Sequence, residues 1–97
     1  MPTKIDKTNH VLGTAIKIVS VIDETVPDTI TVTILDPSEV EIVENVNMTK
    51  ETDQVYYYVW QSDINDDEGL YTAVIKVTSG NYTSISYQEF EMIDVLD

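Results

Sequence analysis

The sequence predicts an all-β protein built as an antiparallel β-sandwich of about seven strands. Short stretches with alternating apolar and polar residues recur along the chain, and this alternation is typical of half-buried strands. Turn-forming residues separate these stretches roughly every ten residues. No stretch as long as an ordinary helix has apolar residues at helical spacing. The 97 residues suit one such domain.

The N-terminal residues Met1–Val11 are polar and aperiodic, so we expect a flexible arm ahead of a sandwich domain at residues 12–97. Residues 1–17 hold three lysines and one aspartate, a balance of +2, whereas the rest of the chain holds two lysines and seventeen acids, a balance of −15. This contrast predicts attraction of the arm to its own sheet or to an acidic neighbour. The alternative is a frayed terminus.

Two strands are expected in the first third of the chain. The first alternates Ile16 and Ile18 with Lys17 and two valines, so both of its faces are partly apolar. The second, Thr29–Leu35, alternates isoleucine or valine with threonine. It is the clearest half-buried strand in the chain.

A turn and an edge strand should follow. Asp36–Glu39 is predicted to be a turn, because Pro37 presets the backbone angle of its first corner and an aspartate can bond the backbone ahead of it. Val40–Glu44 is expected to be a short edge strand, with Val43 and glutamates facing outward. Residues 45–50 are expected to add another short strand.

The stretch Val55–Gln61 carries the largest aromatic content in the chain. We place Tyr56, Tyr58 and Trp60 toward the core, because tryptophan has the most surface to gain from burial. The intervening residues then face outward, and Tyr57 is one of them.

Outward-facing tyrosines form a candidate contact surface, made of Tyr57, Tyr82 and Tyr87 together with Val59. Tyrosine is large, stiff and amphipathic, which suits it to protein contacts. Such a surface can stack against carbohydrate or pack against another subunit. Ordinary cross-strand pairing on a sheet explains the same residues equally well.

The segment around Tyr71 organises the rest of the chain. Asp67, Gly69 and Tyr71 stand at alternate positions where an acidic turn leads into a strand over Gly69–Thr78. This Asp-x-Gly-x-Tyr order resembles the tyrosine corner of immunoglobulin-like β-sandwiches, in which a phenol closes a loop by bonding upstream backbone. The resemblance implies an immunoglobulin-like sandwich in which these three residues are structural.

The last strand is expected over Tyr82–Ile93 after a hairpin turn. Its apolar pattern changes phase, because Ile85 and Tyr87 fit one face whereas Phe90 fits the other. A β-bulge near Tyr87–Gln88 would account for the change.

Composition excludes several kinds of partner. The absence of cysteine excludes disulfides and thiol nucleophiles. The net charge of −13 repels nucleic acid and anionic lipid. No apolar run is long enough to span a membrane as a helix, and no signal-peptide core follows the first residues. We therefore expect no nucleic-acid partner, no membrane insertion and no cofactor.

Catalysis has few residues to build on. His10 is the single histidine, which is too few for a multi-histidine metal site. Glu89 and Glu91 would emerge roughly 7 Å apart on one strand face, but a flat face lacks the cleft that paired-carboxylate hydrolysis needs. The chain has no Gly-rich phosphate loop and no nucleophile elbow. We expect that the protein is not an enzyme.

The acidic loop over residues 63–68 is the candidate for a metal site. Asp63, Asn65 and Asp67 offer alternate oxygen ligands, as at the start of a calcium-binding loop. The glycine comes one residue late, and Val74 occupies the position of the closing glutamate. The pattern favours a solvated acidic turn and allows only a weak calcium site, so no metal is assigned.

Taken together, the stretches Ile30–Pro37, Val55–Gln61 and Tyr82–Ile93 and the corner at Tyr71 resemble the small immunoglobulin-like modules of tailed-virus structural proteins and prokaryotic surface proteins. This resemblance implies a virion accessory module, such as a capsid decoration or a head or tail connector, that docks to other protein subunits or to copies of itself. The alternative is a prokaryotic cell-surface module that binds carbohydrate or protein. Either implies a virion or an extracellular surface as the location.

Overall fold

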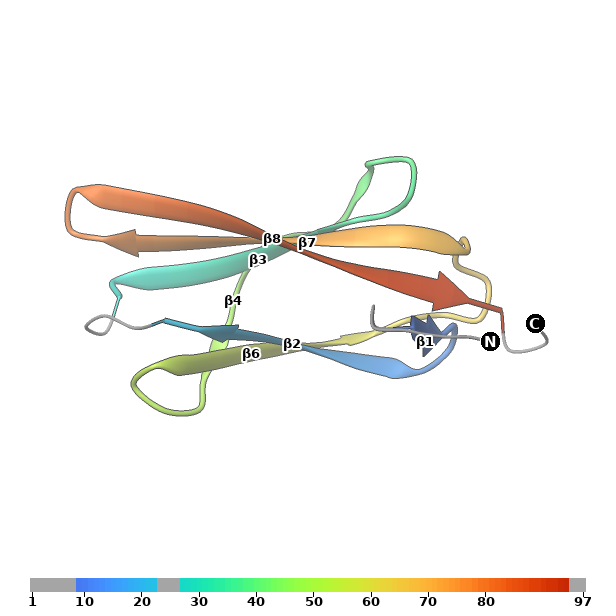
Figure 1. Cartoon of the computed structure of the whole chain (residues 1–97), viewed down its shortest axis with the longest axis horizontal. Helices are drawn as coiled ribbons and strands as arrows, with labels where there is room; N and C mark the ends of the chain where they lie inside the picture. The colour runs from blue at the N-terminus through green and yellow to red at the C-terminus, as the bar shows by residue number, and fades with distance from the viewer. Residues whose placement is uncertain (1–8, 23–26, 95–97) are drawn as a thin grey trace, which may run out of the picture.

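The protein consists of two β-sheets packed face to face (Figure 1). The computed structural model describes residues 9–22 and 27–94, and within these residues it contains eight strands and no helix. The strands are β1 (Asn9–Val11), β2 (Ala15–Val21), β3 (Thr29–Leu35), β4 (Glu41–Asn47), β5 (Thr49–Lys50), β6 (Val55–Gln61), β7 (Gly69–Ser79) and β8 (Tyr82–Ile93). The predicted all-β class is therefore confirmed. None of the described residues belongs to a helix that could cross a membrane.

One sheet has five strands in the order β1-β8-β7-β3-β4, and the other has three in the order β2-β6-β5. The β1–β8 pair is parallel, and the remaining pairs are antiparallel. Figure 1 shows the β7–β8 hairpin at one end of the molecule, where β2 also ends. The edge strand β2 and the part of β8 that β1 does not cover therefore lie in opposite layers at this end of the molecule.

The core lies between the sheets and is built mainly from alternate residues of β2, β3, β6, β7 and the end of β8, as the period of two requires. In β3, for example, the isoleucines and the valine are buried while the threonines are partly or fully exposed. The buried apolar side chains are Leu12, Ile16, Ile18, Ile30, Val32, Ile34, Met48, Tyr56, Trp60, Tyr71, Ala73, Ile75, Phe90 and Met92.

The predicted boundary of the arm is wrong at its C-terminal end. Asn9–Val11 forms β1, which pairs with Glu91–Ile93 of β8. The Leu12 N–H then donates to the Ile93 carbonyl at 2.9 Å. A strand of three residues is too short to show periodicity, so the pattern could not reveal it. The rest of the predicted arm, residues 1–8, lies outside the described residues, and so does its expected attraction to an acidic surface.

The turn between β3 and β4 is held as predicted by its aspartate. The Asp36 Oδ1 accepts hydrogen bonds from the N–H groups of Ser38 and Val40, both at 2.9 Å. The Glu39 N–H donates to the Asp36 carbonyl at 2.8 Å. These hydrogen bonds fix the turn, in which Pro37 lies against Gly69.

The edge strand β4 is longer than the predicted Val40–Glu44, and one of its side chains is reversed. Val43 pairs with Ile34 and packs against the core, so the outward assignment is wrong. The pairing between β3 and β4 contains two register shifts, and Asn45, at the first shift, adopts a φ of 49°. These bulges insert extra residues, and each extra residue exchanges the inward and outward rows.

The predicted bulge in β8 is also wrong. Residues from Tyr82 to Met92 pair without interruption with β7, so the inward row continues from Phe90 through Gln88, Ser86 and Ser84. The phase of the strand stays constant, but at this end its inner row is polar because the other sheet does not cover it. Ile85 and Tyr87 stay on the outer face, where they are exposed.

The aromatic strand β6 faces the core largely as predicted. Tyr56 and Trp60 are buried, and Tyr58 is half-buried against the core. Tyr57 is half-buried on the opposite face, where the ammonium of Lys17 lies 4.8 Å from its ring centroid.

Candidate docking surfaces

The loop that leads into β7 is closed by Tyr71. Its hydroxyl donates a 2.7 Å hydrogen bond to the Asp67 carbonyl, four residues upstream. The ring is 1% exposed and stacks on Phe90 at a centroid distance of 5.7 Å. Trp60 contacts it from the other sheet at 5.4 Å. The phenol therefore joins the two layers and the loop at one point.

Gly69 allows this loop to pack tightly. Its φ is +134°, a conformation that residues with a side chain rarely adopt. A Cβ at this position would lie 2.8 Å from the Cγ of Pro37, in the turn between β3 and β4. Glycine is therefore required for both backbone conformation and contact.

The electrostatic surroundings of Tyr71 disfavour its ionised form. Burial, helped by the nearby carboxylates of Asp66, Asp67 and Asp36, raises the pKa of Tyr71 to about 12. The phenol therefore remains a hydrogen-bond donor over the whole neutral range.

A buried serine, which sequence reasoning missed, closes the end of the three-stranded sheet. The Ser62 hydroxyl donates to the Thr14 carbonyl at 2.6 Å and accepts from the Gly13 N–H at 3.0 Å. The Gln61 side chain adds a bond to the Gly13 carbonyl at 3.1 Å. A serine at the start of an acidic loop gives no sequence signal of this role.

The acidic loop uses its carboxylates to hold its own backbone. The Asp63 Oδ1 accepts from the Asn65 N–H at 2.9 Å, and the Asp66 Oδ2 accepts from the Asp63 N–H at 2.8 Å. Among residues 9–22 and 27–94, no three side chains of His, Cys, Asp or Glu converge as metal ligands. Asp67 contributes its carbonyl to Tyr71. The arrangement is that of a self-bonded turn.

His10 lies in β1, where its ring meets the edge of Phe90 at a centroid distance of 5.9 Å and an angle of 82°. Partial burial lowers the pKa of His10 below its usual value. The contact is aromatic packing at the sandwich edge.

The three tyrosines predicted to form one contact surface lie on three separate parts of the molecule. Tyr57 belongs to the outer face of the three-stranded sheet, and Tyr87 to the outer face of the five-stranded sheet. Tyr82 stands at the hairpin end in the inward-directed row, with 80% of its side chain exposed. The predicted single surface is wrong, because Tyr57 belongs to a different sheet and Tyr82 and Tyr87 point to opposite faces of the same strand.

The outer face of β7 and β8 carries several exposed apolar side chains. Tyr87 is 68% exposed beside Val74, and Ile85 is 54% exposed beside Lys76. Leu70, further along β7, is 45% exposed. We call Leu70, Val74, Ile85 and Tyr87 the outer apolar strip.

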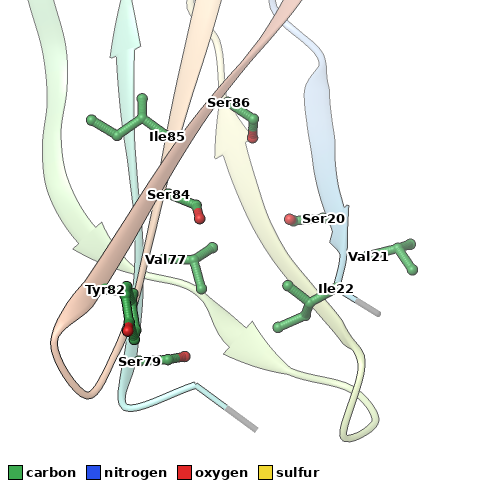
Figure 2. A pocket seen from close by; sticks show the side chains of 9 residues that line it. All are labelled: Ser20, Val21, Ile22, Val77, Ser79, Tyr82, Ser84, Ile85 and Ser86. Atoms are coloured by element: carbon green, nitrogen blue, oxygen red, sulfur yellow. The ribbon is translucent and has the colours of Figure 1, made fainter. Parts of the chain in front are cut away.

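A cavity of about 250 Å³ opens between the layers at the hairpin end. Figure 2 shows Ser20 and Ile22 on one side of it and Val77 and Ser84 on the other, while Ile85 points away. The space is lined by serines, aliphatic residues and Tyr82, which come from β2, the residue after it, β7 and β8.

A side chain replaces strand pairing across this open side. Gln88, from the inner row of β8, donates its Nε2 to the Val19 carbonyl of β2 at 2.8 Å. A second, smaller hollow, lined in part by His10 and Ile16, lies beyond Gln88 toward β1. The open side is thus a groove between two strand edges, crossed by one amide.

No protein-family model matches the chain, and no curated protein is significantly similar to it in sequence.

Proposed function

We propose that the chain is an immunoglobulin-like β-sandwich that works by docking to other protein subunits. The order of strands supports the first part. In immunoglobulin-like sandwiches strands C, F and G share one sheet, joined by C′ in some members, while B, E and D share the other. The neighbours β4, β3, β7 and β8 here match the first set, and β2, β6 and β5 match the second.

The position of Tyr71 adds support. It is the third residue of β7, the counterpart of strand F, and its hydroxyl bonds upstream backbone as in a tyrosine corner. Trp60 lies on β6, the counterpart of strand E, instead of the strand C position of antibody domains. This difference favours a module outside the antibody-type group.

The outer apolar strip is the observation that carries the docking function. Two large side chains of β8, Ile85 and Tyr87, are more than half exposed next to each other on one sheet face. Burying them against a partner would release apolar surface from water, and tyrosines near an interface centre often dominate affinity. The charge of −13 keeps free chains soluble and apart, so the strip favours a partner that is less acidic.

The biological setting follows from the resemblance to tailed-virus structural modules. In that setting the chain is a capsid decoration or connector subunit on the virion. The second candidate is a cell-surface module that binds carbohydrate, and the nearly free ring of Tyr82 favours it, since an exposed aromatic face can stack on a sugar.

The experiment compares two matched variants recovered from the native source. Ile85→Glu places an acid on the outer apolar strip. Val59→Glu is the control: it places an acid on the other sheet, at a β-branched residue that is similarly exposed, 48% against 54% for Ile85. Native mass measurement should find the parent and Val59→Glu in a defined assembly and Ile85→Glu as the free 11.0 kDa chain. Equal assembly of both variants would refute docking through this strip. Binding to immobilised glycans that Tyr82→Ala abolishes would instead support the second candidate.

A further inference from the structure

The first half of β8 is a strand with an open edge. β1 pairs only with Glu91–Ile93, and no other strand among the described residues pairs with β8 on that side. Residues 82–87 are also exposed on both faces of the strand. This half of β8 is held to the molecule mainly through its ladder to β7.

The hairpin turn determines which backbone groups face the open edge. Ser79 pairs with Tyr82 across a two-residue loop, and Gly80 has a φ of 60° while Asn81 does not have a positive φ. This is the pattern of a type II′ turn, whose flanking residues exchange hydrogen bonds with each other. Backbone direction alternates along a strand, so the N–H and C=O groups of Thr83, Ile85 and Tyr87 point to the open edge.

The other sheet edges carry features that discourage pairing. β4 is broken by two bulges and carries Glu41 and Glu44. β5 has only two residues. β2 carries Lys17, and its Val19 carbonyl is occupied by Gln88. Charges, bulges and shortness are the usual protections of an edge, and residues 82–88 have none of them.

The groove beside this edge has room for side chains of an added strand. A strand that continued the sheet beyond β8 would direct alternate side chains between the layers, toward the cavity lined by Ser20, Ser84 and Ser86. Its other side chains would extend the outer face beside Ile85 and Tyr87. Both the polar backbone and the two side-chain rows of such a strand would therefore find partners.

Charge selects the kind of strand. Residues 80–88 contain no charged side chain, whereas Glu89 and Glu91 follow directly on the outer face. A second copy of this chain would bring another net charge of −13 to the same place, which disfavours self-pairing. A neutral or basic segment meets no such repulsion, and a lysine or arginine in it would pair with Glu89.

We propose that the open edge of β8 at residues 83–87 binds an extended, neutral-to-basic segment of a partner protein by β-strand addition. The partner strand has small or polar side chains toward the groove, apolar ones beside Ile85 and Tyr87, and a basic residue at the end that meets Glu89. This inference rests on the proposed docking function and names the partner's form and chemistry. Strand addition supplies affinity through the backbone and specificity through alternate side chains.

Amide hydrogen exchange of the full chain, followed by NMR, tests the proposal. In the free protein the amides of Ser84, Ser86 and Gln88 should exchange slowly, whereas those of Thr83, Ile85 and Tyr87 should exchange rapidly. The probe is the blocked synthetic peptide Lys-Thr-Val-Ser-Val-Thr-Val, in which the lysine and the valines share one face, together with its reversed sequence because the strand direction is open. One of the two should slow the three rapid amides by about tenfold or more at saturation.

Three controls separate strand addition from other binding. Peptide with glutamate in place of lysine should bind about tenfold more weakly, through lost attraction and added repulsion at Glu89. Two further peptides carry N-methyl groups, one on the odd-numbered residues and the other on the even-numbered residues. Only one of these two methylation patterns should abolish binding, because only one set of amides faces β8. Ile85→Pro should abolish binding, while Ile85→Thr, which keeps the edge N–H, should retain it.

Several outcomes overturn the proposal. Slow exchange of Thr83, Ile85 and Tyr87 in the free monomer means that the chain covers its own edge, and protection that rises with protein concentration means that a second copy does. Absence of protection by both peptides at millimolar concentration, or equal effects of both methylation patterns, excludes strand addition. If Ile85→Glu still dissociates the native assembly in that case, docking uses the outer face and only this inference fails.

Discussion

Replacing Tyr71 by phenylalanine removes one hydroxyl and leaves the aromatic packing in place. The lost interaction is the 2.7 Å bond to the Asp67 carbonyl, while the ring contacts with Phe90 and Trp60 persist. A hydrogen bond of this kind contributes about 0.5–1.5 kcal/mol to stability. Asp67 itself is exposed, so water can reach the loop, and we expect a loss near the middle of that range.

The assay is thermal and urea unfolding of the parent and variant. For a domain of this size about 1 kcal/mol corresponds to a decrease in Tm of roughly 4–8 °C. Tyr87→Phe is the matched control, because this side chain is 68% exposed and its change should leave Tm the same. Equal midpoints for Tyr71→Phe and the parent would show that the hydroxyl does not stabilise the loop.

The same variant has a pH signature. The pKa of Tyr71 is raised to about 12 in the folded chain, above the ordinary value of 10.0. The stabilisation from the neutral phenol is therefore complete below about pH 10 and is lost as the pH rises toward about 12. Urea midpoints should show the advantage of the parent over Tyr71→Phe at about pH 8 and its decline at about pH 11. A pH-independent difference would contradict the raised pKa.

Three further substitutions or deletions test the packing. Trp60→Ala should lower the free energy of unfolding by an amount on the order of 3–5 kcal/mol, because Trp60 is only 8% exposed, and urea unfolding measures this loss. Red-shifted fluorescence of Trp60 in the native protein would contradict its burial. Gly69→Ala should destabilise the fold by about 1–3 kcal/mol or more, since its Cβ would lie 2.8 Å from a ring carbon of Pro37. Gly80→Ala is the control, because a Cβ there has no neighbour within 4 Å, and it should destabilise the fold less. Equal Tm values for the two variants would refute the contact. Deleting residues 1–11 should lower Tm more than deleting residues 1–8, because only the longer deletion removes β1; identical midpoints would mean that β1 adds no stability.

Much of the fold follows from local patterns in the sequence. The threonine alternation of β3 and the aromatic spacing of β6 predict which side chains are buried, because each strand has one face on the core. The loop before Tyr71 is equally predictable from the sequence, since Asp67 and Gly69 stand four and two residues ahead of this tyrosine, as in a tyrosine corner. These features depend on a few neighbouring residues.

The predictions that were wrong concern features that depend on contacts between segments distant in the sequence. β1 is visible only through its pairing with Glu91–Ile93, and the row reversal at Val43 depends on bulges that pairing with β3 creates. In β8 the inner row turns polar although the strand is regular, because coverage by the other sheet ends there. Period alone reports which side chains share a face, not whether that face is covered.

The candidate surfaces were still harder to predict. Residue type alone groups Tyr57, Tyr82 and Tyr87, whereas the structure places Tyr57 on the other sheet and points Tyr82 and Tyr87 to opposite faces of β8. The open edge leaves no mark except a stretch without charge, residues 80–88, in a strongly acidic chain. That signal becomes specific only when the strand order shows where β8 lies.

Hydrogen exchange of the native assembly, read by mass spectrometry on peptic peptides, tests the docking surface most directly. Peptides that cover residues 82–88 should exchange more slowly in the assembly than in the isolated chain, while peptides from β5 and β6 should be unchanged. Protection confined to the three-stranded sheet, or no assembly-dependent protection of residues 82–88, would contradict the account.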